Sequence, residues 1–130
     1  MTTSTSRPIV ITMGDPSGVG PEVTVKALAA LDAAEWQDFA VVGDAAVLGR
    51  ALAASGLDLP LVAPGGEGIA VIDVPVEGLP DRFGVLSPRC GEACFQYIRT
   101  AVEWTQSGRA AGIVTAPINK EALNLSLIHI

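Results

Sequence analysis

The sequence predicts an α/β protein built on a mainly parallel, doubly wound sheet. Short β-branched runs alternate with segments of helical periodicity, which is the order expected of parallel strands joined by helices. Apolar residues make up 49% of the 130 residues and charged residues only 17%, a balance typical of strands covered on both faces. A glycine-rich turn after the first β-branched run adds the strand–loop–helix unit common in this class.

The first third of the chain predicts two strands with a helix between them. The strands are expected at 8–12 and 38–42, where the residues are apolar and largely β-branched. The helix is expected at 21–31, because Pro21 suits a first helical position and Glu22 favours the positive end of the helix dipole. The residues expected on its buried face are Val23, Ala27, Ala30 and Leu31.

The middle of the chain predicts a second helix and two more strands. Asp44 suits a helix N-cap and Gly56 suits a helix end, so a helix is expected between them. Two short apolar runs at 59–63 and 69–74 predict strands. A turn-rich connection follows at 77–84.

The last third predicts a long helix, a buried strand and a short helix. The long helix is expected to start near Ser87 and to end before Gly108. The strand is expected at 111–115, and the short helix begins at Ile118. The residues expected to face inward from the long helix are Phe95, Ile98, Val102 and Trp104.

The glycine-rich turn is a candidate anion site. Three glycines and two prolines lie in residues 11–23, ITMGDPSGVGPEV, between the first strand and the first helix. Such a turn leaves backbone N–H groups at the carboxyl edge of a sheet, where they suit a phosphate. The alternative is that the glycines only permit a tight turn from strand to helix.

The turn does not complete either familiar phosphate motif. A P-loop would end in Gly-Lys-Ser/Thr, whereas this turn continues Gly20-Pro21-Glu22. In the dinucleotide fingerprint Gly18 and Gly20 fit, but Val23 occupies the place of the last glycine. Asp44 lies roughly where that motif expects a ribose-binding acid, so the match is partial.

Two motifs resemble those of a known family, the 4-hydroxythreonine-4-phosphate dehydrogenases. Their opening signature, T-x-G-[DE]-P-[AS]-G-[IV]-G-P, is matched by residues 12–22, TMGDPSGVGPE. A second hallmark, T-[AG]-P-[IV]-[NH]-K, is matched within residues 112–123, GIVTAPINKEAL, after the segment CGEA at 90–93. Both motifs come in the family's order and spacing, and the resemblance covers roughly residues 8 to 123.

The resemblance implies an activity and a set of partners. It implies an isocitrate/isopropylmalate dehydrogenase-like fold, of which this chain holds only the N-terminal part. The reaction would be oxidation of the secondary alcohol of 4-phosphooxy-L-threonine by NAD or NADP, followed by loss of carbon dioxide to give 3-amino-2-oxopropyl phosphate in pyridoxal phosphate biosynthesis. A divalent metal would polarise the alcohol oxygen, and the full-length enzyme would be a homodimer.

The same resemblance implies that this chain is incomplete. The family's histidine metal ligands and most of its cofactor contacts lie beyond Ile130, so no catalytic or metal-binding residue is assigned in this chain. Residues 1–123 are expected to form the N-terminal portion, whereas 124–130 does not resemble the family's continuation. His129 is therefore not equated with a family histidine, and the chain alone is expected to be inactive.

Seven residues are the candidate contacts to substrate or cofactor. Both motifs follow strands, so they would line one cleft if those strands are neighbours. Asp15 is expected to shape its own loop, although it could instead touch a ligand. Lys120 is expected to meet a phosphate or carboxylate, with a solvated lysine as the alternative, and Asn119 to hydrogen-bond substrate. The full set is Gly14, Asp15, Pro16, Gly18, Thr115, Asn119 and Lys120.

Charge and hydropathy exclude other functions. The net charge is −6, which argues against nucleic-acid binding. No apolar run is long enough to cross a membrane, and the first residues lack the layout of a signal peptide, so a cytoplasmic protein is expected. Cys90 and Cys94 are interpreted as two small residues on one helix face, in preference to half a metal site or a redox pair.

Three other functions stay open at this point. The first is a related dehydrogenase acting on a phosphorylated sugar acid, such as threonate or erythronate phosphate. The second is a non-catalytic phosphate- or nucleotide-binding module, and the third is a fragment that does not fold.

Overall fold

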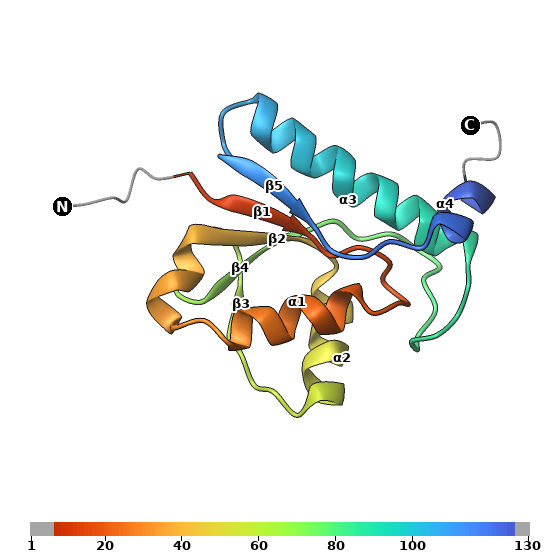
Figure 1. Ribbon diagram of the computed structural model, residues 1–130, viewed down its shortest axis with the longest axis horizontal. Coiled ribbons are helices and arrows are strands. Elements are labelled where there is room, and N and C mark those ends of the chain that lie inside the picture. The colour runs from red at the N-terminus through yellow and green to blue at the C-terminus, as the bar shows by residue number, and fades with distance from the viewer. Residues whose placement is uncertain (1–6, 127–130) are drawn as a thin grey trace.

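The computed structural model describes residues 7–126 and is built on one five-stranded sheet (Figure 1). The strand order is β3-β4-β2-β1-β5, and every neighbouring pair is parallel. The mainly parallel α/β fold predicted from the sequence is therefore confirmed. The strands are β1 (Ile9–Thr12), β2 (Phe39–Gly43), β3 (Leu61–Val62), β4 (Ile69–Asp73) and β5 (Gly112–Thr115).

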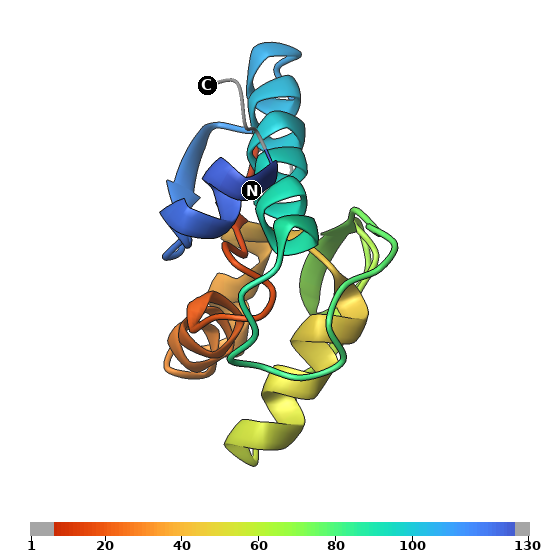
Figure 2. The same cartoon turned by 90° about the vertical axis from the view of Figure 1, so that its right-hand side faces the viewer.

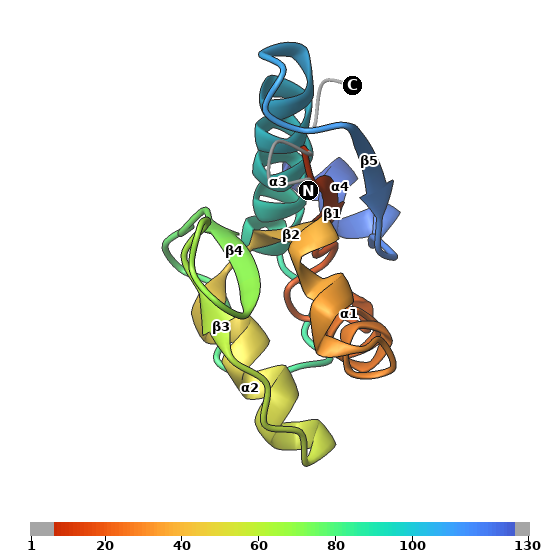
Figure 3. The ribbon, with the colours of Figure 1, turned by 90° about the vertical axis from the view of Figure 1, so that its left-hand side faces the viewer.

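Helices cover both faces of the sheet. The helices α1 and α2 lie together on one face, and α3 lies on the other (Figure 1 and Figure 3). The short helix α4 packs against α3. The helical segments are α1 (Gly20–Ala29), the 3₁₀ helix η1 (Ala33–Asp38), α2 (Ala45–Ser55), α3 (Pro88–Gln106) and α4 (Lys120–Ser126).

The order of the strands creates a switch point between β1 and β5. From β1 the chain moves to β2 and on to the edge strand β3, and it then turns back to β4, which lies between β3 and β2. The helix α3 then carries it across to β5, on the other side of β1. Right-handed crossovers put the helices of the outward path on one face and the returning helix on the other. The loops that leave β1 and β5 therefore diverge toward opposite faces, which opens a crevice at the carboxyl ends of these two strands.

The caps of α2 and α3 are the residues that the sequence indicates. The side chain of Asp44 caps α2, where its Oδ1 accepts hydrogen bonds from the backbone N–H groups of Ala46 at 2.9 Å and Val47 at 3.1 Å. Gly56 ends the same helix in the left-handed region, with φ at +67°. Ser87 caps α3 by accepting from the N–H of Arg89.

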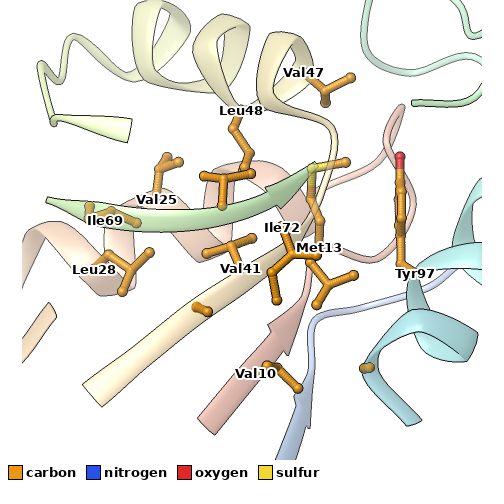
Figure 4. Packing of buried hydrophobic residues seen from close by; sticks show 14 of the residues in the cluster. Val10, Met13, Val25, Leu28, Val41, Val47, Leu48, Ile69, Ile72 and Tyr97 are labelled. Atoms are coloured by element: carbon orange, nitrogen blue, oxygen red, sulfur yellow. The ribbon is translucent and has the colours of Figure 1, made fainter. Parts of the chain in front are cut away.

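The hydrophobic core lies on both sides of the sheet. On one side, Val25, Leu28 and Leu48 from α1 and α2 gather around Val41 and Ile69 of the sheet (Figure 4). On the other side, Tyr97 and the small residues of α3 cover alternate residues of β1 and β2. Burial on both faces explains the apolar runs of β2 and β4. The prediction that the strand near 111–115 is buried is wrong: β5 lies at the edge of the sheet, and its Ile113 and Val114 are 37% and 51% exposed.

The buried face predicted for α1 is largely wrong. Val23 is 48% exposed and Ala27 and Ala30 are also exposed, whereas Thr24, Val25 and Leu28 are buried. Of the four predicted residues, Leu31 is partly buried and packs against the core. The path of the chain out of the glycine loop decides which stripe meets the sheet.

The inward face predicted for α3 is also largely wrong. Phe95 and Val102 are 40% and 36% exposed and Ile98 is half-buried, whereas the predicted Trp104 is partly buried against the core. The buried residues of α3 are mainly small, together with one tyrosine, and this lets the helix approach the sheet and α4 closely. These residues are Cys90, Gly91, Ala93, Cys94, Tyr97 and Ala101, of which Gly91 packs against α4.

Several element boundaries differ from the predictions by one or two residues, and two of these differences have a clear cause. The strand expected at 59–63 is only Leu61–Val62, because a proline stands at each side of it. The last helix begins at Lys120 and not at Ile118, because Asn119 is its cap. The predicted tail, with His129, lies largely outside the described residues. Within residues 7–126, no helix is long and apolar enough to span a membrane.

We expect Tyr97→Phe to stabilise the fold. The Tyr97 hydroxyl is fully buried and has no hydrogen-bond partner among the described residues, so removing it relieves the cost of a desolvated polar group. Urea denaturation should show a free energy of unfolding raised by about 1 kcal/mol.

The matched control is Thr105→Val on the same helix. The Thr105 hydroxyl donates to the carbonyl of Ala101 at 2.9 Å, so its loss should lower the free energy of unfolding by up to about 1 kcal/mol. A loss of stability in Tyr97→Phe would contradict the expected cost of the buried hydroxyl.

Candidate functional site

The two motifs meet at the carboxyl edge of the sheet. The glycine loop, residues 13–19, follows β1, and the second loop, residues 116–119, follows β5, its immediate neighbour (Figure 2). The N–H of Asp15 donates to the carbonyl of Pro117 at 3.2 Å, which joins the two loops directly. The convergence of the two motifs expected from the sequence is therefore confirmed.

Two glycines permit this contact between the loops. Gly14 has φ at +80°, and a Cβ added there would overlap the carbonyl oxygen of Pro117. A Cβ at Gly20 would overlap the carbonyl oxygen of Met13 and lie 3.2 Å from that of Pro117. These glycines let one backbone segment pack directly on another. This role differs from the two considered from the sequence, which were binding a phosphate and permitting a tight turn.

Asp15 shapes the glycine loop from within. The residue is 4% exposed, and its Oδ1 accepts a hydrogen bond from the N–H of Ser17 at 2.9 Å. Its carbonyl accepts from the N–H of Gly18 at 3.0 Å. These contacts are those expected of a residue that shapes its own loop.

The glycine loop uses most of its own backbone donors. The N–H group of Asp15 donates to the carbonyl of Pro117, and those of Ser17 and Gly18 donate to the side chain and the carbonyl of Asp15. Pro16 has no N–H group. The expectation that this loop presents a set of free amides to a phosphate is therefore wrong for residues 15–18. The reason is that the loop folds back on its own carboxylate and on Pro117.

Asn119 and Lys120 stand at the start of α4. Asn119 Oδ1 accepts from the backbone N–H groups of Glu121 at 3.0 Å and Ala122 at 3.1 Å, so this side chain is an N-cap. Only its amide NH₂ is left for a ligand. Lys120 is exposed, and among residues 7–126 its ammonium has no ion-pair partner.

A shallow hollow of about 440 Å³ lies between the two loops. Four of the seven predicted contacts line it: Asp15, Gly18, Asn119 and Lys120. The other three do not line it. Gly14 and Pro16 are buried inside the glycine loop, and Thr115 is exposed on β5.

Ser17 is a site residue that the sequence analysis missed. Its Oγ accepts from the N–H of Val85 at 2.8 Å and donates to the carbonyl of Arg82 at 3.2 Å, while its carbonyl accepts from the N–H of Gly84 at 2.6 Å. These bonds tie the connection between β4 and α3 to the glycine loop. In the sequence, only its position inside the glycine-rich motif indicated a role in the site, because its hydrogen-bond partners lie far away along the chain.

The two cysteines lie under both loops. Burial, and then the nearby Asp15 carboxylate, raise the pKa of the Cys90 thiol from 9.0 to about 11. Burial chiefly raises the pKa of Cys94 to about 12, and this thiol also lies beside the backbone N–H of Asn119. Both thiols are neutral and buried, which agrees with their interpretation as small packing residues.

The described residues do not form a metal or dinucleotide site by themselves. Within residues 7–126, no group of three histidine, cysteine or carboxylate side chains could hold a metal ion. Asp44, the candidate ribose-binding acid, is engaged as the cap of α2, and the motif glycines are used in loop packing.

Comparison with known proteins identifies similar chains. The family model described as pyridoxal phosphate biosynthetic protein PdxA matches residues 35–130. A Bradyrhizobium diazoefficiens protein, provisionally named D-threonate 4-phosphate dehydrogenase, is 40% identical over 96% of this chain and 39% of the relative. A protein of Desulfosudis oleivorans, named 4-hydroxythreonine-4-phosphate dehydrogenase, is 38% identical over 92% of this chain and 38% of the relative.

Solved structures agree with the sequence matches. The crystal structure of a 4-hydroxythreonine-4-phosphate dehydrogenase from Burkholderia phymatum has a TM-score of 0.81 and 42% identity, over 92% of this chain and 39% of that one. A terephthalate 1,2-cis-dihydrodiol dehydrogenase from Burkholderia xenovorans has a TM-score of 0.72 and 30% identity, over 93% of this chain and 37% of that one. The predicted family resemblance is confirmed, and the chain spans about two fifths of the length of these relatives.

We expect Gly14→Ala to destabilise the fold by about 3 kcal/mol or more, because it combines an unfavourable φ with overlap of the Pro117 carbonyl. Gly56→Ala is the matched control: it has a similar φ of +67° and nothing within 4 Å of the added Cβ. The control should lose only about 1 kcal/mol in the same urea denaturation. Equal losses in the two variants would contradict a role for close contact between the loops.

The raised thiol pKa values predict a loss of stability at alkaline pH. The folded state holds both thiol protons more tightly than the unfolded state. The stability that the protonated thiols contribute is therefore full below pH 9.0, and it is lost as pH rises toward about 11 for Cys90 and about 12 for Cys94. Each thiol should lower the free energy of unfolding by up to about 1.4 kcal/mol per pH unit above its ordinary pKa.

Urea denaturation at about pH 8 and at about pH 10 measures this loss, because these values lie below and above the ordinary thiol pKa of 9.0. The control is the double variant Cys90→Ala, Cys94→Ala, which should lack most of the decrease. A decrease of the same size in both proteins would show that other groups cause it.

Proposed function

The chain belongs to the family of the pyridoxal phosphate biosynthetic protein PdxA, and we propose that it forms the phosphate-binding part of a dehydrogenase acting on 4-phosphooxy-L-threonine. The reaction proposed is oxidation of the secondary alcohol with NAD or NADP, followed by decarboxylation, as the family resemblance implies. The complete enzyme would act as a homodimer in the cytoplasm.

The observation that carries this proposal is the exposed Lys120 ammonium beside the hollow between the two motifs. The N–H groups of Asp15, Ser17 and Gly18 are already engaged, so the proposed attraction for an anion is the Lys120 ammonium, which lines the hollow together with the carboxylates of Asp15 and Glu121. The NH₂ group of Asn119 adds a donor at the same edge. The proposed role of both residues is to hold the phosphate and orient the substrate.

The cofactor and metal are proposed to be held by residues outside this chain. When bound, a nicotinamide accepts the hydride and a divalent metal polarises the alcohol oxygen. The residues described for this chain do not fit either group, so their proposed role is confined to binding, orienting and shaping.

A second candidate is a dehydrogenase for D-threonate 4-phosphate. Relatives at 40% and 36% identity carry that name provisionally. The two substrates share a phosphate ester at the fourth carbon, which is the group assigned to Lys120. Choice between them would fall to contacts at the other end of the substrate.

A binding experiment tests the proposed function. We expect isothermal titration of the chain to show saturable binding of 4-phosphooxy-L-threonine and of D-threonate 4-phosphate, and none of threonine. Lys120→Ala should weaken binding of the phosphate esters about ten-fold or more, because it removes a charge-assisted contact of about 1.5 to 3 kcal/mol.

Lys26→Ala is the matched control, since Lys26 is an exposed lysine paired with Glu22 on α1 and does not line the hollow between the loops. It should leave binding unchanged. Equal binding of phosphorylated and unphosphorylated compounds, or equal effects of the two lysines, would rule out the proposed phosphate site.

With substrate, NAD and Mg²⁺, the chain alone should form no NADH above background.

A further inference from the structure

The N-terminal end of α3 lies directly against α4 and the two motif loops (Figure 2). Cys90 lies in contact with the carboxylate of Asp15, and Cys94 lies in contact with the backbone N–H of Asn119. Between these cysteines, Gly91 is buried against α4. The first turns of α3 therefore reach both halves of the candidate site.

Gly91 is the position at which α3 and α4 come closest. A Cβ added to Gly91 would overlap the carbonyl group of Ala122 and lie 2.7 Å from the backbone nitrogen of Leu123. The atoms in the way belong to the backbone of α4, so no change of side-chain rotamer could relieve the overlap. A side chain at this position would have to push α4 away from α3.

Such a shift of α4 would be passed on to the candidate site. Ala122 is fully buried, and its N–H donates to Asn119 Oδ1 at 3.1 Å. Lys120 lies between these two residues in the first turn of the helix. The place of Ala122 against Gly91 thus sets the place of the cap and of the lysine.

The other end of the same loop is held by the glycine loop. The carbonyl of Pro117 accepts from the N–H of Asp15, and Gly14 allows that carbonyl to approach. The segment from Pro117 to Ala122 is therefore fixed at both ends, by the glycine loop on one side and by α3 on the other.

We infer that Gly91 is a positioning residue of the candidate site: it lets α4 pack on α3 so that Asn119 and Lys120 face the glycine loop. The consequence for a bound anion rests on the proposed function, whereas the position of α4 does not. Gly91 itself does not line the hollow. A glycine is required there because backbone approaches backbone.

Hydrogen exchange of single amides in the 130-residue chain tests the inference. In Gly91→Ala, the amides of Asp15 and Ala122 should exchange about ten-fold faster or more, because their acceptors, Pro117 O and Asn119 Oδ1, move away. The amide of Met13, which donates to Val42 at 2.9 Å within the sheet, is the internal reference and should be unchanged.

Gly49→Ala is the matched control, because Gly49 lies in α2 with nothing within 4 Å of an added Cβ. It should change none of the three amides. Unchanged exchange in Gly91→Ala, or equal acceleration of Met13, would overturn the inference, the latter because it marks a general loss of stability. Should Gly91→Ala not fold, Ala122→Val enlarges the fully buried residue whose carbonyl group lies against Gly91, and this variant is judged by the same criteria.

A titration with inorganic phosphate, followed at the Lys120 amide, separates this inference from the proposed function. Gly91→Ala should weaken phosphate binding about five-fold or more, and Gly49→Ala should not. A wild-type chain that binds no phosphate would count against the proposed function alone, since the exchange experiment still decides the role of Gly91. If Gly91→Ala shows the accelerated exchange but binds phosphate with wild-type affinity, the position of α4 does not affect anion binding, and that part of the inference is wrong.

Discussion

The approach of the Pro117 carbonyl to the glycine loop brings together segments from opposite ends of the chain. This contact needs a backbone without side chains at Gly14 and Gly20, and it is closed by the N–H of Asp15. The loop, the start of α4 and the hollow between them all follow from it. Ser17 extends the same arrangement to the connection before α3, so three separate segments are held at one edge of the sheet.

The topology of the sheet explains why the candidate site lies at this edge. The loops after β1 and β5 leave toward opposite faces, and the crevice that opens there is the usual ligand site of parallel sheets. Packing within the crevice engages the backbone donors of Asp15, Ser17 and Gly18, so the proposed recognition of an anion is assigned to side chains from the second loop. A family motif that looks like a phosphate cradle in the sequence is, in the folded chain, mainly a joint between two loops.

The errors in the predicted helix faces share one feature. Val23, Phe95 and Val102 are large and apolar, so their periodicity predicted buried faces, yet all three are exposed. The face of α3 that packs inward is rich in small residues, because close approach of a helix favours low volume as much as hydrophobicity. Asp44 is the helix cap that the sequence also predicted, whereas the structure adds that Asn119 caps α4 while it still lines the hollow.

The sequence by itself determined the parallel α/β class, the order of nearly all elements, the family and the two motifs of the site. These depend on local patterns: β-branched runs, cap residues, and glycines at fixed spacing. Only the tertiary structure decided which helix faces are buried, which glycines touch which carbonyls, and which motif residues reach the hollow. Those outcomes depend on the distance between segments far apart in the chain, and local pattern carries no record of that distance.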